Sequence, residues 1–234
     1  MQKRCVRNNL GQPELQIPRV VVICDTPKSI ETILSLIVLA ELHRLKIIKL
    51  QAVIATLMPA DCRAEMTLGI LELLNLPDVP VGIGSTATTA RYDLQAFEFD
   101  GTDSIVATKT EKLKNGSRLL YDVLCENELL LQKSRLVLLT SLTDIAYLSV
   151  EFPNLLTSDR IEFISMQGKY KTGSDGGRDP DLETRNNLYD KQAAEIWYQY
   201  MVSSASVKFL RQCISRIRYG NCHGLFLNSL SWAT

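Results

Sequence analysis

The alternation of short apolar runs with longer helical patterns is the feature of this sequence that most restricts its fold. The run over residues 20–24 is continuous and rich in β-branched side chains, as expected of a strand buried on both faces. Similar runs predict strands at residues 20–24, 47–55, 79–81, 135–139 and 161–166, and the segments among them predict helices at 27–43, 61–76, 117–132, 142–151 and 189–202. This alternation favours βαβ units and therefore an α/β fold with a mainly parallel sheet.

The length of 234 residues suits one sizeable domain. We expect a polar N-terminal tail over residues 1–18 and a single domain over residues 19–234. The mixed segment 85–110 fits no element, residues 167–185 form a Gly- and Asp-rich loop, and the periodicity after residue 208 is weak.

Composition excludes several classes of protein. With 26 basic and 26 acidic residues, the formal net charge is zero, so no overall field attracts nucleic acid or an anionic membrane. The most apolar stretch, residues 33–40, is far shorter than the ~20 residues that cross a bilayer. The 46% of hydrophobic residues is enough for a buried core.

Cysteine usage indicates a reducing compartment. The six cysteines are scattered, without a CxxC pair, and a chain of this size needs no disulfides to fold. No signal-peptide pattern opens the sequence. We therefore expect a cytoplasmic or other reducing intracellular location; the basic residues near the N-terminus leave a mitochondrial one open.

Asp25 is the first candidate for chemistry. It follows the buried strand and precedes a helix that we expect to begin with Thr26 as N-cap and Pro27 in the first turn. Because the carboxyl ends of parallel strands share an edge, Asp25, the turn 140–144 and the loop from Gln167 should lie at one edge, where ligands bind. A plain capping role is the alternative for Asp25, and Lys28 would repel a metal cation there.

Four ordered segments resemble the inosine–uridine-preferring nucleoside hydrolases (nucleoside N-ribohydrolases). Residues 21–34, VVICDTPKSIETIL, resemble a damaged form of the opening motif, a strand followed by D-T-D-P-G-x-D-D-A-L. Residues 73–81, LLNLPDVPV, resemble L-L-x-x-P-D-V-P-V, residues 139–146, LTSLTDIA, resemble L-G-P-L-T-N-L-A, and residues 186–194, NNLYDKQAA, resemble N-x-x-x-D-P-E-A-A. The resemblance covers about residues 19–204 and implies a mainly parallel sheet with helices on both faces.

The resemblance also implies a chemistry. Members of this family hold a calcium ion with the second and fourth acids of the opening motif, the Thr carbonyl of L-T-N and an Asp near the C-terminus. The ion binds ribose hydroxyls and a water, the second acid takes the proton of that water, and the attack expels the base.

Carried over position by position, the calcium site is mostly lost. Asp25 matches the first acid, which is close in sequence to the lost ligand position, and Thr143 matches the carbonyl donor, so these two are what remains of a vestigial metal site. Pro27 stands at the second acid and Thr32 at the fourth, which removes two anionic ligands and the general base. Since calcium takes six to eight oxygens, commonly including carboxylates, we expect its binding to be weak or absent.

The ribose side is partly kept. Glu31 replaces a ribose-binding Asp and Asn186 matches the family's asparagine, so both are candidate substrate-binding residues. Thr184 stands where a glutamate is expected, although Glu183 is adjacent. His223 is a doubtful match to the family's C-terminal His, and we expect a shortened C-terminal part.

Three hypotheses follow. The leading one is a nucleoside-hydrolase-like protein with a degenerate site, no cofactor and a non-catalytic binding or structural role, with a nucleoside ligand, a homo-oligomer or a protein assembly as possible partners. The alternative is an active N-ribohydrolase that retains calcium, with Asp25 as general base and Glu31 as a shifted ligand. A thiol enzyme using Cys24 has little support, because no His or second Cys lies near it in sequence. In the leading hypothesis, Lys28 pairs with Asp25 or Glu31 in place of the ion.

Overall fold

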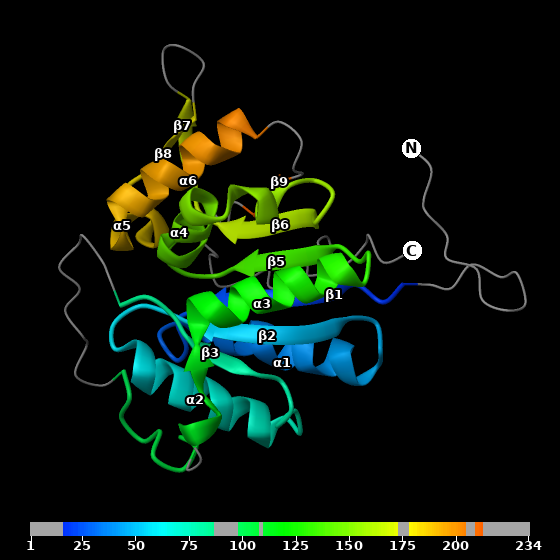
Figure 1. Cartoon of the computed structure of the whole chain (residues 1–234). Helices are drawn as coiled ribbons and strands as arrows, with labels where there is room; N and C mark the ends of the chain where they lie inside the picture. The colour runs from blue at the N-terminus through cyan, green and yellow to red at the C-terminus, as the bar shows by residue number, and fades with distance from the viewer. Residues whose placement is uncertain (1–15, 87–97, 108–109, 173–177, 205–208, 213–234) are drawn as a thin grey trace, which may run out of the picture.

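A seven-stranded parallel sheet forms the centre of the molecule (Figure 1). The computed structural model describes residues 16–86, 98–107, 110–172, 178–204 and 209–212. The strand order is β4-β3-β2-β1-β5-β6-β9, so the first strand is central. The strands are β1 (Arg19–Cys24), β2 (Lys49–Ala55), β3 (Val81–Ile83), β4 (Lys114–Asn115), β5 (Ser134–Leu138), β6 (Ile161–Gln167) and β9 (Phe209–Gln212). The predicted α/β class and parallel sheet are confirmed.

Helices cover both faces of this sheet. One core lies between the sheet and α1 and α2, and the other lies between the sheet and α3, α4 and α6. The side chains of β1 alternate between them: Val22 packs in the first core and Val21 and Ile23 in the second. The helices are α1 (Ile30–Arg44), α2 (Ala60–Leu73), α3 (Gly116–Leu129), α4 (Thr143–Glu151), α5 (Arg185–Tyr189) and α6 (Lys191–Ser203), with short 3-10 turns η1 (Thr110–Lys112) and η2 (Pro153–Leu156). Within the part of the chain that the structure describes, no helix is long and apolar enough to cross a membrane.

Several short elements differ from the prediction. The expected loop after β6 contains an antiparallel hairpin of β7 (Tyr170–Thr172) and β8 (Arg178–Pro180). The helix expected over residues 189–202 is α6, which begins at Lys191 because the Asp190 carboxylate caps it by accepting a hydrogen bond from Ala193 N (3.0 Å). The short helix α5 before it was not expected. Strands of two to four residues, such as β4 and β9, are too short to carry a periodic pattern.

The start of α1 corrects the expected cap. Thr26 and Pro27 precede the helix, which begins at Ile30 with Ser29 as its N-cap. The Ser29 hydroxyl accepts the backbone N–H of Thr32 (3.2 Å), and Lys28 N donates to Asp25 O (2.9 Å) in the turn before it. This turn lies between the end of β1 and the helix, and it forms part of the candidate site.

Candidate functional site

The carboxyl ends of β1, β5 and β6 bring the expected residues to one edge of the sheet. Asp25 follows β1, the turn 139–142 joins β5 to α4, and Gln167 ends β6. The parallel register of β1 with β5, and of β5 with β6, aligns these ends. This edge is where ligands bind in open α/β sheets.

Asp25 is almost sealed from solvent. It is 3% exposed, and its Oδ1 accepts a hydrogen bond from Thr32 Oγ1 (3.2 Å). Burial raises the pKa of Asp25, while the charge of Arg63, the Thr32 hydroxyl and the charge of Lys28 lower it. The carboxyl group is therefore held by side chains of the protein itself.

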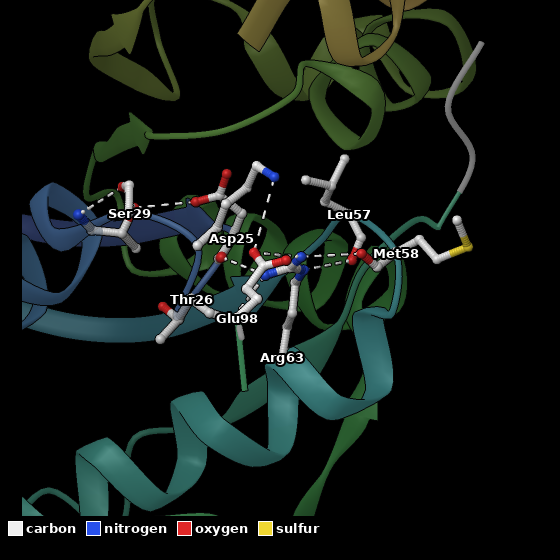
Figure 2. A network of polar contacts seen from close by, with 9 residues as sticks. Asp25, Thr26, Ser29, Leu57, Met58, Arg63 and Glu98 are labelled. Carbon is white, nitrogen blue, oxygen red and sulfur yellow. Dashed lines mark hydrogen bonds and ion pairs between the residues drawn. The ribbon is translucent and has the colours of Figure 1, made fainter. Parts of the chain in front are cut away.

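Arg63 is the main site residue that the sequence did not predict. Its side chain is fully buried and extends from α2 toward the ends of β1 and β2 (Figure 2). Nε donates to Leu57 O (3.1 Å), Nη1 to Asp25 O (2.9 Å) and Nη2 to Met58 O (3.1 Å). The sequence gives one indication of its burial: Arg63 lies at helical spacing from Ala60 and Thr67, so it shares a helix face with these two buried residues.

Glu98 completes a buried ionic cluster with Arg63 and Lys28. Glu98 Oε1 lies 3.1 Å from Arg63 Nη2 and 3.9 Å from Lys28 Nζ, and the side chains of Glu98 and Lys28 are 6% and 12% exposed. Lys28 Nζ also lies 5.0 Å from the centre of the Tyr189 ring. Burial lowers the pKa of Lys28 to about 8, although Glu98 raises it. Lys28 thus forms an ion pair with Glu98, and its charge also acts on the carboxylate of Asp25, one of the two partners that we expected.

The other candidates lie on different elements. Thr143 begins α4, and its hydroxyl donates to Asp190 Oδ2 (2.9 Å), which links α4 to the cap of α6. Asn186, in α5, places its Nδ2 3.4 Å from both Gln167 O and Gln167 Oε1, at the end of β6. Glu31 is half-buried in the first turn of α1, and its carboxylate makes no hydrogen bond or ion pair with the described residues. His223 lies outside the described residues.

Asp144 is a second buried carboxylate that the sequence did not single out. It is 3% exposed, and its Oδ1 accepts the backbone N–H of Ser85 (2.9 Å) at the end of β3. Its Oδ2 has no hydrogen-bond partner among the described residues. Burial raises the pKa of Asp144, and contacts with Thr56 and Ser85 offset only part of that rise. It occupies the place of the asparagine in L-T-N.

A thiol chemistry at Cys24 does not fit this environment. The side chain is buried, and burial raises its pKa to about 11, so little thiolate forms at neutral pH.

The residues present do not fit a calcium ion. Pro27 and Thr32 supply no carboxylate, and Arg63 and Lys28 place two positive charges beside Asp25. Thr143, the expected carbonyl donor, is the first residue of a helix, where a carbonyl points along the axis toward the next turn. Among the residues that the structure describes, no three His, Cys, Asp or Glu side chains form a group that could hold a metal.

Comparison with solved structures assigns the fold. The chain has the fold of the nucleoside hydrolases, and it resembles both enzymes and an effector protein. The type III effector protein XopQ, solved in complex with adenosine diphosphate ribose, matches with a TM-score of 0.69 and 21% identity over 84% of this chain and 58% of that chain. The inosine–uridine-preferring nucleoside hydrolase from Bacillus anthracis matches with a TM-score of 0.56 and 15% identity, over 85% of this chain and 65% of that one. An inosine–guanosine nucleoside hydrolase matches with a TM-score of 0.61 and 14% identity, over 83% and 62%.

These likenesses extend over part of each neighbour. The chain spans less than three fifths of the length of XopQ and about three fifths of the hydrolases. No protein-family model matches the sequence, and no curated protein matches it.

Proposed function

We propose that the chain is a non-catalytic binding protein with a nucleoside-hydrolase-like fold. The observation that carries this proposal is the state of Asp25, the one acid of the opening motif kept at its own place. It is buried and accepts a hydrogen bond from Thr32, which stands where the motif has its fourth acid. A base sealed in this way, without a second acid or a fitting metal site, cannot readily take a proton from an attacking water.

The ligand that we propose is a ribose-containing nucleoside or nucleotide, bound at the carboxyl edge of the sheet. XopQ was solved with adenosine diphosphate ribose, and the similar hydrolases are named for their action on nucleosides. Asn186 and Glu31 are the candidate contacts to the sugar. An amide and a carboxylate suit the hydroxyl groups of a ribose.

The second candidate is an active N-ribohydrolase. The raised pKa of Asp25 favours it, because buried carboxylates with shifted pKa values are typical of acid–base sites. In that case Asp25 would act as the general base.

One pair of assays separates the two candidates. We expect calorimetry with adenosine and with adenosine diphosphate ribose to give saturable binding, and we expect no release of base from inosine, uridine or adenosine with or without calcium. Asp25→Asn is compared with the wild type, and Asp159→Asn, at an exposed position, is the matched control. Calcium-dependent turnover that is lost in Asp25→Asn and kept in Asp159→Asn would establish the enzyme and reject the first proposal.

A further inference from the structure

We propose that the guanidinium of Arg63 is the resident cation of this site. It joins the segments that follow β1 and β2 to Glu98, and it removes the need for a divalent ion there. This inference concerns the empty protein and stands whether or not a nucleoside binds.

The contacts of Arg63 resemble those of a cation in a ring of oxygen atoms. Its nitrogens donate to carbonyl oxygens of Asp25 (2.9 Å), Leu57 (3.1 Å) and Met58 (3.1 Å), and to the carboxylate of Glu98 (3.1 Å). A longer contact joins Nη1 to Thr26 O (3.5 Å). These oxygens come from three segments that are distant in sequence. Hard metal ions such as calcium take the same kinds of ligand, backbone carbonyls and carboxylates.

The burial of Arg63 requires such a set of partners. Arginine is almost never fully buried unless its charge is paired, and Arg63 is fully buried. Carbonyl dipoles and one carboxylate compensate the charge, and the planar fork of the guanidinium matches them at several positions. Phe99, whose ring centre lies 5.4 Å from Arg63 Cζ, adds an aromatic face to the cluster.

The position of Arg63 connects the cluster to the ligand edge. An arginine elsewhere in the core would have no bearing on a metal, but Arg63 Nη1 donates a hydrogen bond to the backbone carbonyl of Asp25, the acid kept from the opening motif and close to the lost ligand position. Lys28 adds a second charge 3.9 Å from Glu98. A divalent ion at Asp25 would be repelled by both cations, and that repulsion is strong where water is excluded.

The first test is a calcium titration of the wild-type protein. We expect the same melting temperature in excess EGTA and in millimolar calcium, and no heat of binding by calorimetry. A saturable calcium site would overturn the proposal. Such a site would raise the melting temperature by about 5 °C or more when calcium is at a hundredfold excess over its Kd.

The second test replaces the cation from solution. Arg63→Ala should melt at a lower temperature than the wild type, and low millimolar ethylguanidinium should recover part of that loss. The neutral isostere ethylurea should not do so, because it lacks the charge. The proposal would be overturned if the two compounds raised the melting temperature of Arg63→Ala equally, or if ethylguanidinium raised that of the wild type as much as that of Arg63→Ala. Either result would show that Arg63 acts through packing alone. If Arg63→Ala does not fold, Arg63→Lys is used instead. We expect this variant to be less stable than the wild type and still insensitive to calcium. A stability equal to that of the wild type would contradict the role proposed for the guanidinium.

Discussion

The replacement Asp144→Asn is expected to make the protein more stable at neutral pH. Asp144 is buried, and among the described residues only one of its two carboxylate oxygens has a hydrogen-bond partner, Ser85 N at 2.9 Å. The hydroxyl of Thr56 interacts with Asp144 but gives its own proton to Ser85 O (2.8 Å). An asparagine keeps the acceptor for Ser85 N and replaces the charged, unpaired oxygen by an amide that can donate to the Thr56 oxygen.

The expected gain is about 1–3 kcal/mol, the cost of leaving a buried polar group without its partner. Its pH dependence follows from the sign of the pKa shift. Burial raises the pKa of Asp144 in the folded state above its ordinary value of 3.8, so the folded wild type holds this proton more tightly than the unfolded chain. The stability that this proton contributes is complete below pH 3.8 and is lost as the pH rises through the folded-state pKa. The advantage of the asparagine variant should therefore be small in acid and reach its full size above that pKa.

Urea unfolding at a series of pH values from 4 to 8 measures this difference. Asp159→Asn, the same chemical change at an exposed position, should stay within about 0.5 kcal/mol of the wild type. A loss of stability in Asp144→Asn at pH 7 would refute the reasoning, because it would mean that the negative charge has a partner that the hydrogen bonds do not reveal.

Three further predictions concern single side chains. Thiol labelling of the folded protein, followed by peptide mass spectrometry, should modify exposed Cys62 much faster than Cys24, whose burial raises its pKa to about 11; equal rates would contradict this. Burial lowers the pKa of Lys28 to about 8, against 10.5 in the unfolded chain. The wild type should therefore gain stability relative to Lys28→Met as the pH rises from about 8 to 10.5. A difference in unfolding free energy between the two proteins that stays constant over this range in urea unfolding would contradict the prediction. Ser29→Ala removes the N-cap of α1 and should lower the free energy of unfolding by about 0.5–2 kcal/mol. The control Ser158→Ala, whose side chain caps no helix, should leave that free energy unchanged. An unchanged stability of Ser29→Ala would show that the cap contributes nothing.

Local patterns were enough to predict five strands of the sheet and the edge that carries the candidate site. The β-branched run of β1 and the helical pattern of α2 are set by neighbours along the chain, so they appear in the sequence itself. Asp25 was found because it follows such a run. The resemblance to nucleoside hydrolases, carried by four short segments, predicted the fold that the solved structures share with this chain.

The ionic cluster could not be predicted in this way. Arg63 and Glu98 are 35 residues apart, and Glu98 lies in a segment without periodicity. Their pairing depends on where the chain returns after β3, which no local pattern encodes. The start of α1 was misplaced for a related reason: Thr26 and Ser29 are both good capping residues, and the turn of Lys28 N onto Asp25 O leaves Ser29 at the start of the helix.

A guanidinium and a calcium ion differ in one property that links the two proposals. Each neutralises oxygen atoms at the end of a parallel sheet, but only the metal carries a water whose pKa it lowers and whose attack it directs. A fixed arginine has no free coordination position, because its N–H groups are already bonded to the strand ends and Glu98. If Arg63 holds this place, the ligand edge keeps its shape and loses its source of nucleophilic water. Binding of a ribose-containing ligand and cleavage of its glycosidic bond then become separable properties, which is why calcium dependence is the measurement that tests both proposals at once.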